Sequence, residues 1–314
     1  MWSFIARRLL TVIPVLFLVS IGVFLLQALV PGDPAVQVAG DQATPEQIAQ
    51  VRHDLHLDRP IVDRYVNWAR DAVRGDLGSS IYSNASVKDQ IASRFPTTLS
   101  LVLASVVIAV VVGLPLGAFA AVFPNGIIDR ISRGVSSLGV AIPSFVLGLL
   151  LIIVVSVRLR WLPPLGYTAI AQDPGEWVRH ILLPAATLGA LLMAIFSRQL
   201  KASLSDAMES NYIRSAFAHG TSRSVVIWKH GLKNSMIPAV TVLAVQTGAL
   251  LGGTVIVEQM FSIPGIGPYV LDAIRRGDYP VIQGVALVFA LSQMLIGLLL
   301  DVSYGLLNPR VRVS

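Results

Sequence analysis

The sequence contains no cysteine and little charge. Cysteine is absent from all 314 residues, which excludes a disulfide framework, a thiolate metal site and a cysteine nucleophile. Charged residues make up 13% of the chain, whereas a soluble domain carries about 25%. Hydrophobic residues make up 54%, and the mean hydropathy is +0.70. These values exclude a disordered protein, a coiled coil and an ordinary cytosolic enzyme, and they indicate an all-α polytopic membrane protein.

Six long apolar stretches are expected to cross the membrane as helices. Each crossing needs about 20 mainly apolar residues, because the hydrocarbon core is about 30 Å thick. The expected spans are residues 9–30, 98–123, 135–157, 180–197, 236–257 and 281–300. The first follows two arginines, as a signal peptide would. Its apolar run exceeds the usual length of about 7–15 residues and no clear cleavage site follows, so we interpret it as an uncleaved anchor.

The basic residues predict the orientation, because Lys and Arg collect on the cytoplasmic side. With both termini in the cytoplasm, the inside segments hold 12 of the 24 basic residues and four of the 18 acidic residues. The inside then carries a formal charge of +8 and the outside −2. The net charge of +6 therefore reflects membrane orientation and not nucleic-acid binding.

We expect three parts in the chain: a membrane helix at 1–30, an extracytoplasmic helical segment at 31–97, and a five-helix membrane core at 98–314. The external segment has signals for three helices. Thr44-Pro45-Glu46-Gln47 forms a capping box with proline at the first helical position. A second helix is expected between Pro60 and Gly75, and a third should end before Pro96. A folded cap and a docking role both remain open for this segment.

The core contains a cytoplasmic loop at 198–235, in which two helices are expected to meet at Gly220. Residues 211–220 provide one or two helical turns, and glycine closes a helix in the left-handed conformation. Ser222 is placed to cap the next helix.

We call residues 212–232 the knuckle. Tyr212, Phe217 and Trp228 are large apolar groups for a short wet loop, and such groups mark contact sites. The small Ala216 and Ala218 allow close approach of another protein. A self-packed loop is the alternative interpretation.

The external loop at 258–280 begins with residues too apolar for a wet loop and too broken for a helix. Pro264-Gly265 favours a type II turn. Irregular apolar backbone near a membrane must be covered by protein or line a cavity. An external gate and a static plug are therefore both open, and the gate candidates are Phe261, Pro264, Gly265, Ile266 and Gly267.

Four polar side chains in the spans are candidates for the translocation path. They are Gln246, Thr247, Gln283 and Gln293. Interhelical hydrogen bonds are the alternative role for each of them.

Short motifs follow one another along the whole chain. They are Pro31-Gly32-Asp33-Pro34, Leu57-Asp58-Arg59-Pro60, Gly75-Asp76-Leu77-Gly78-Ser79-Ser80, Ala141-Ile142-Pro143-Ser144-Phe145, Trp161-Leu162-Pro163-Pro164, Phe261-Ser262-Ile263-Pro264-Gly265-Ile266-Gly267, Asp278-Tyr279-Pro280-Val281 and Leu307-Asn308-Pro309-Arg310. With these motifs in order, the chain resembles the permease subunits of bacterial ABC importers of the dipeptide, oligopeptide and nickel class. The resemblance implies a type I ABC importer permease fold in the bacterial cytoplasmic membrane.

The knuckle resembles the coupling loop of ABC permeases, in which a Glu-Ala-Ala run is followed by a glycine. Ala216 and Gly220 match this pattern, whereas Arg214 and Ser215 replace Glu and the first Ala. Lys233 replaces a proline at its far end. The coupling residues implied by the resemblance are Tyr212, Arg214, Ser215, Ala216, Phe217, Ala218, His219, Gly220 and Leu232.

The chain has no Gly-x-x-x-x-Gly-Lys-Ser/Thr phosphate loop. We therefore expect a non-catalytic subunit that binds no cofactor, with ATP and Mg on its partners. The resemblance implies a second homologous permease, two cytoplasmic ATPase subunits or domains, and an extracytoplasmic binding protein around it in the lipid bilayer.

The expected cargo is a dipeptide or oligopeptide, with nickel chelates, glutathione and haem as alternatives. An ion-coupled secondary transporter would need ionisable groups inside the spans, and here Glu258 and Asp301 stand at span ends. An intramembrane hydrolase would need His, Asp or Ser groups arranged at mid-membrane, but the nearest His, His180, stands at a span boundary and no span holds an Asp partner. A channel or structural subunit would leave the knuckle without a purpose.

Overall fold

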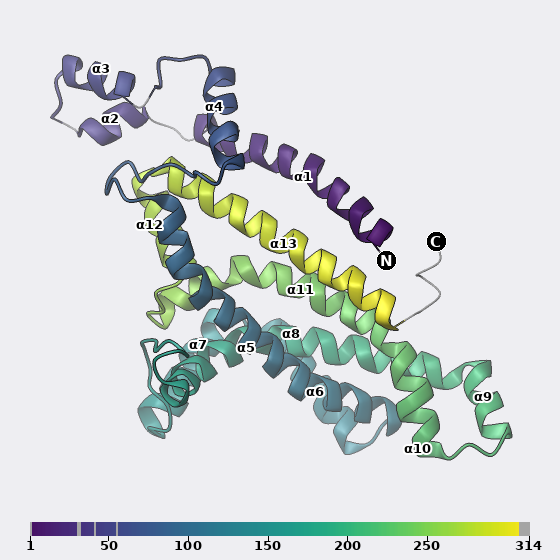
Figure 1. Ribbon diagram of the computed structural model, residues 1–314. Coiled ribbons are helices and arrows are strands. Elements are labelled where there is room, and N and C mark those ends of the chain that lie inside the picture. Colours follow the sequence, from purple (N-terminus) through teal and green to yellow (C-terminus); the bar gives the residue numbers. More distant parts are fainter. Residues whose placement is uncertain (1, 30–32, 41, 55, 308–314) are drawn as a thin grey trace. The chain divides into compact units, whose positions relative to one another are not determined.

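The computed structural model describes residues 2–29, 33–40, 42–54 and 56–307 (Figure 1). Regular structure in these ranges is helical, apart from an isolated bridge between Ser79 and Ser86. The predicted end of the first span at 30 and the motif residues 31–32 and 308–310 lie outside the described residues.

The helices follow one another with short connections. They are α1 (Trp2–Leu29), α2 (Pro34–Ala39), α3 (Pro45–Asp54), α4 (Ile61–Val73), α5 (Val87–Val122), α6 (Ile127–Ala141), α7 (Ser144–Leu151), the π-helix η1 (Ile152–Arg158), α8 (Pro174–Glu209), α9 (Asn211–Ala218), α10 (Arg223–Val225), the π-helix η2 (Val226–Gly231), α11 (Leu232–Met260), α12 (Ile266–Arg276) and α13 (Tyr279–Leu307).

The chain divides into two compact units. The first comprises residues 1–96 and 265–294, and the second comprises residues 97–264 and 295–314. The division does not coincide with the three parts expected from the sequence.

In the first unit, α4 packs on α1 through aromatic side chains. The rings of Tyr65 and Trp68 lie 5.4 Å and 5.7 Å from the ring of Phe24, and the Tyr65 hydroxyl lies 2.8 Å from Ser20 Oγ. Val73, the last residue of α4, is 89% exposed and takes no part in this packing.

The capping box of α3 is confirmed. The Thr44 N–H donates to Gln47 Oε1 at 2.9 Å, and the Gln47 N–H donates to Thr44 Oγ1 at 3.3 Å. The two bonds satisfy donors that a helix start otherwise leaves without partners.

Two of the motifs carried by the resemblance form one joint in the first unit. Ser80 Oγ donates to Asp278 Oδ2 at 2.5 Å, and the Ile81 N–H donates to Asp278 Oδ1 at 3.3 Å. The Tyr82 hydroxyl donates to the Arg276 carbonyl. Burial, with the neighbouring Asp278 carboxylate, raises the pKa of Tyr82, so this donor keeps its proton at neutral pH.

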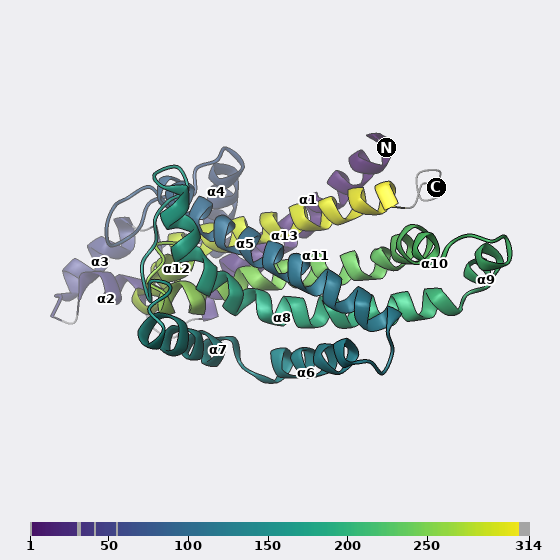
Figure 2. The ribbon, with the colours of Figure 1, turned by 90° about the horizontal axis from the view of Figure 1, so that it is seen from below.

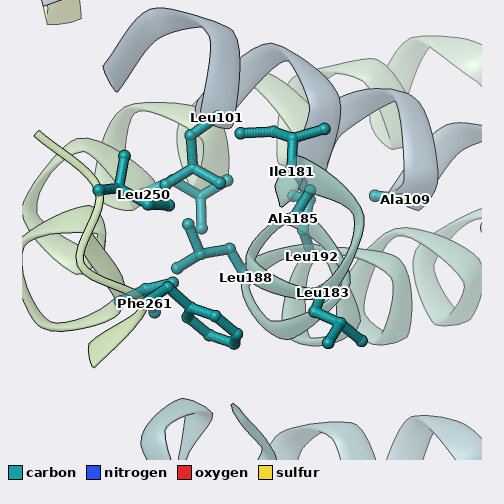
Figure 3. Close-up of a cluster of buried hydrophobic side chains, with 11 residues drawn as sticks. Leu101, Ala109, Ile181, Leu183, Ala185, Leu188, Leu192, Leu250 and Phe261 are labelled. Atoms are coloured by element: carbon teal, nitrogen blue, oxygen red, sulfur yellow. The ribbon is translucent and has the colours of Figure 1, made fainter. Parts of the chain in front are cut away.

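The second unit is built around α8 and α11, which run side by side (Figures 1 and 2). Figure 3 shows the main apolar cluster, where side chains of α5, α8 and α11 converge with Phe261. A further cluster joins Phe196, Leu200 and Leu204 of α8 to Ala118 and Ala239. Helices α5, α8 and α11 thus share a continuous packing surface.

Four helices are long and apolar enough to cross a membrane, within the described residues. They are residues 87–122, 174–209, 223–260 and 279–304. A fifth crossing is obtained if α6 and the helical stretch Ser144–Arg158 are taken as one broken span. The apolar stretch Ile13–Leu25 of α1 is shorter than these four.

The predicted third span is wrong as a continuous helix. The helical segments Ile127–Ala141 and Ser144–Arg158 make an angle of 108° at the short break between them, which consists of Ile142 and Pro143. Pro143 stands at this break with extended backbone (φ −57°, ψ 139°). Proline removes a backbone donor and disfavours helix in the residue before it, which explains the interruption.

The prediction that a helix ends before Pro96 is also wrong, because α5 continues to Val122. Val87 and Ile91 precede Pro96 and are buried against Val281 and Val285. Tertiary packing therefore stabilises this turn of helix despite its proline. The predicted fourth span likewise extends at both ends, since α8 runs over 36 residues.

Candidate functional site

The knuckle begins where α8 ends. Ser210 takes an extended conformation (φ −70°, ψ 154°) between α8 and α9. At the other end of α9, Gly220 has φ +76°, and its N–H donates to the Phe217 carbonyl at 2.9 Å. The predicted pair of helices meeting at a left-handed glycine is therefore confirmed (Figure 1).

The large apolar side chains of the knuckle point outward. Tyr212, Phe217 and Trp228 are each about 40% exposed (42%, 41% and 40%), while Ile213 is fully buried. Of the other coupling candidates, Arg214, Ser215, Ala218, His219 and Gly220 are exposed, and Ala216 and Leu232 are half-buried. A self-packed loop would hide its aromatic groups, so the exposed ones favour a contact surface.

The base of the knuckle is fixed to the membrane helices. Ser235 Oγ lies 3.1 Å from the Ser203 carbonyl of α8 and 2.8 Å from the Gly231 carbonyl. A Cβ on Gly231 would lie 3.1 Å from Leu204 Cδ1, so side chains of α8 pack closely against the backbone of η2 here. The Trp228 ring meets Phe119 edge-on at 5.6 Å. These contacts join the knuckle to α5, α8 and α11.

A π-helical turn, η2, joins the knuckle to α11. It places Val226 and Ile227 in the interior and leaves Trp228 at the surface. The sequence predicted a helix here but no change of helical pitch. Such turns are rare and frequent at functional sites.

The external gate segment is shorter than predicted, because α11 continues to Met260 and α12 begins at Ile266. The type II turn at Pro264-Gly265 is wrong, since Gly265 has φ −90° and ψ −164°. The chain turns instead at Ser262, which has φ +55°. The Ile263 N–H donates to the Glu258 carbonyl at 2.8 Å, which closes α11 as a Schellman motif.

The gate candidates fall in both units, since the division lies between Pro264 and Gly265. In the second unit, Phe261 is buried in the main cluster, and its carbonyl accepts the Gly166 N–H at 2.9 Å, while Pro264 is exposed. In the first unit, Gly265, Ile266 and Gly267 are buried.

The four path candidates have different surroundings. Gln246 lines a hollow of about 120 Å³ in the second unit, bounded by Ser144 of α7 and by residues of α8 and α11. Thr247 Oγ1 donates to the Leu243 carbonyl of its own helix at 2.7 Å. On the first unit's part of α13, Gln283 is buried and Gln293 is exposed. Ser144 was not predicted as a lining residue, because its place depends on the bend after α6.

An ion-pair cluster on α6 and α8 was also missed by sequence reasoning. The buried Asp129 carboxylate accepts a hydrogen bond from Lys201 Nζ and lies 3.6 Å from Arg133 Nη2. Lys201 is 72 positions away along the chain, and no local pattern links it to Asp129. Among the described residues, no group of His, Asp and Glu side chains is arranged to hold a metal ion.

The long apolar helices, the exposed knuckle and the hollow beside Gln246 describe an integral membrane transport component. Comparison with known families gives its class. Residues 113–313 match the binding-protein-dependent transport system inner membrane component, and residues 1–102 match the N-terminal domain of such membrane components. The chain belongs to this family, as a permease subunit of the ABC importers of the peptide and nickel class.

Similar proteins extend over the full length of the chain. The glutathione transport system permease protein GsiC of Escherichia coli O6:H1 is 44% identical over 312 residues, which cover 99% of each chain. The proteins of the same name from Escherichia coli strain K12 and Shigella dysenteriae serotype 1 are 43% identical over the same length. The chain is thus a non-catalytic, multi-pass component of the inner membrane.

Proposed function

We propose that the chain forms, with a second homologous permease, the pathway through which an ABC importer takes up glutathione or a closely related short peptide. The observation that carries this proposal is the identity of 44% over 99% of the chain to a glutathione transport permease. Among the cargo classes left open by the sequence, this favours glutathione over the dipeptides and oligopeptides that were expected first.

In this proposal the chain crosses the membrane six times, with both termini in the cytoplasm. The 28 residues of α1 supply the first crossing, and the broken pair α6–α7 supplies the third. The distribution of basic residues supports the orientation.

The knuckle is the proposed docking surface for the ATPase subunits. Its exposed aromatic side chains fit a partner's apolar pocket, and its packed base connects it to α8 and α11. ATP-driven closure of the two ATPases moves the knuckle, the spans turn the pathway outward, and hydrolysis resets them. An extracytoplasmic binding protein delivers the cargo. ATP and Mg remain on the ATPase partners.

The hollow beside Gln246 is the proposed part of the pathway within this chain. Its amide both donates and accepts hydrogen bonds, as a peptide backbone requires. Ser144, which also lines the hollow, adds a hydroxyl.

The cargo is tested with the complete transporter in proteoliposomes. Uptake of labelled glutathione should depend on ATP and on the binding protein, and should exceed uptake of a dipeptide and of a nickel chelate at equal concentration. Gln246→Leu should lower glutathione uptake about tenfold, the size expected for one lost polar contact of 1–2 kcal/mol. Gln259→Leu, at an exposed position of the same helix that does not line the hollow, is the matched control. Preferential uptake of the dipeptide would contradict the glutathione assignment without contradicting the ABC permease class.

A further inference from the structure

A second hollow, distinct from the one beside Gln246, lies between α6 and α8. We call it the basic hollow. It has a volume of about 360 Å³ and is lined by Ser132, Arg133 and Ser137 of α6 and by Arg198, Lys201 and Ala202 of α8. Neither the family match nor the knuckle accounts for it.

The walls of the basic hollow are firmly joined. Ser136 Oγ and Ser197 Oγ lie 3.2 Å apart in a buried contact between the two helices. A Cβ on Gly139 would lie 2.8 Å from the Cβ of Ala194, so the helices approach closely. The basic side chains are therefore presented by a rigid pair of helices and not by a loop.

The hollow carries excess positive charge. The Asp129 carboxylate is shared by Lys201 and, at 3.6 Å, by Arg133. Arg198 makes no ion pair with any described residue. The hollow is thus lined by three cationic side chains, two of which share one carboxylate, and the serine hydroxyls of α6 add hydrogen-bond donors to its wall.

The position of the hollow along α8 matches the level of lipid headgroups. Arg198 directly follows the uncharged apolar stretch at 180–197, so it stands where the hydrocarbon core ends. On α6, Leu138 follows the lining residues Arg133 and Ser137 toward the membrane interior in the proposed orientation, and it is 60% exposed. An apolar surface that acyl chains can cover therefore continues beyond the cations.

We propose that the basic hollow binds the phosphate headgroup of an anionic phospholipid from the cytoplasmic leaflet. Guanidinium groups recognise phosphate oxygens in a bidentate manner. Basic pockets between membrane helices on the cytoplasmic side bind anionic headgroups, and the cytoplasmic leaflet supplies them. The site rests on the proposed orientation of the chain, but it needs neither the ATPases nor cargo.

An acidic segment of a partner protein is the competing occupant. The exposed Leu138 favours the lipid, because acyl chains below a bound headgroup would cover this apolar side chain and an acidic segment would not. The experiment must nevertheless separate the two.

The full-length chain, purified with its partner subunits, is placed in nanodiscs of equal parts phosphatidylethanolamine and phosphatidylglycerol. Lipids that stay bound through detergent extraction are measured by mass spectrometry. We expect phosphatidylglycerol to be retained in preference to phosphatidylethanolamine, and Arg198→Gln to lower this preference about fivefold, the effect of one basic contact at a membrane surface. Arg198→Lys, which keeps the charge, should retain most of the preference.

Arg130→Gln is the matched control, since Arg130 lies exposed on α6 and does not line the hollow. An equal loss in Arg130→Gln, or no loss in Arg198→Gln, would overturn the site. Displacement of the lipid by inorganic phosphate at equal concentration would make it a site for free anions. Unchanged lipid retention with weaker co-purification of the ATPases in Arg198→Gln would make it a protein contact. If lipid retention follows these expectations while glutathione uptake fails, only the proposed cargo is contradicted.

Discussion

Gly220 shows how a single backbone conformation sets the shape of the knuckle. Its φ is +76°, and a Cβ placed there would meet nothing within 4 Å. Any effect of a side chain would therefore come from backbone strain and not from a clash. Residues other than glycine lose about 1–2 kcal/mol in the left-handed region, and Asn loses less.

We expect Gly220→Leu to uncouple ATP hydrolysis from uptake in the assembled transporter, while Gly220→Asn stays close to wild type. The measurement is the number of cargo molecules taken up per ATP hydrolysed in proteoliposomes. A normal ratio of uptake to ATP hydrolysis in Gly220→Leu would show that the knuckle does not couple the two.

At the joint, loss of the Asp278 carboxylate is expected to lower the stability of the fold, because its hydrogen bonds would be lost. Asp278→Ala would leave Ser80 Oγ and the Ile81 N–H without their acceptor, and an unsatisfied buried donor costs about 1–3 kcal/mol. We expect a clear fall in the melting temperature of the detergent-solubilised protein.

Asp272→Ala is the control for this joint. Asp272 lies on α12 with 57% of its side chain exposed and pairs with Arg276 at 3.1 Å. A surface pair contributes about 0–1 kcal/mol, so this change should have little effect. Equal destabilisation by the two changes would refute the structural role of the joint.

Residue by residue, the sequence revealed features that have a local signal. Thr44 and Gln47 stand at capping-box spacing, and Gly220 marks a helix end, so both were predictable. Ser262 was missed because serine rarely takes a positive φ and the adjacent Pro264-Gly265 favours another turn. The Lys201 and Asp129 pair required knowledge of which helices are neighbours.

At the scale of elements, the contact between α6 and α8 offers a matched pair of glycines. A Cβ on Gly139 would lie 2.8 Å from the Ala194 Cβ and 3.2 Å from the Ala190 carbonyl oxygen, whereas a Cβ on Gly134 would meet nothing within 4 Å. The two glycines lie on the same helix.

We expect Gly139→Ala to destabilise the protein by about 1–3 kcal/mol through overpacking. Gly134→Ala should instead stabilise it by about 0.5–1 kcal/mol, because alanine favours a helix interior. Thermal unfolding followed by tryptophan fluorescence measures both. The prediction requires that the two changes in the free energy of unfolding have opposite signs. If both variants lose stability, close packing is not particular to Gly139 and the prediction is wrong.

The helices that were predicted best from the sequence are those that a long apolar stretch is enough to identify. The long apolar helices α5, α8, α11 and α13 appear where the composition places them, although each is longer than its apolar stretch. The break between α6 and α7 was not predicted, because hydropathy does not change across Pro143 and proline often only kinks a membrane helix. The bend then decides that Ser144 and Gln246 line the same hollow, which no count along the chain would have shown.

At the scale of the whole molecule, the orientation is open to direct test. A reporter fused after Asp206 should be cytoplasmic, and one fused after Asp54 should be external. Asp206 lies near the end of α8 and Asp54 at the end of α3, and phosphatase and fluorescent-protein fusions are the suitable measurements. The reverse pattern at both sites would refute the orientation, and one reversed site would refute the number of crossings.

The joint between Ser80 and Asp278 also has a consequence for biosynthesis. Its two halves are 198 positions apart, so at about 5–20 residues per second Asp278 leaves the ribosome about 10–40 s after Ser80. Throughout that interval Ser80 has no Asp278 to bind, and the start of α5 lacks the α13 side chains on which it packs in the finished chain. Nascent chains arrested before α12 should therefore remain open to protease at the 78–86 turn, and those arrested after α13 should become resistant. Maturation of this segment is thus timed by synthesis of the last helices.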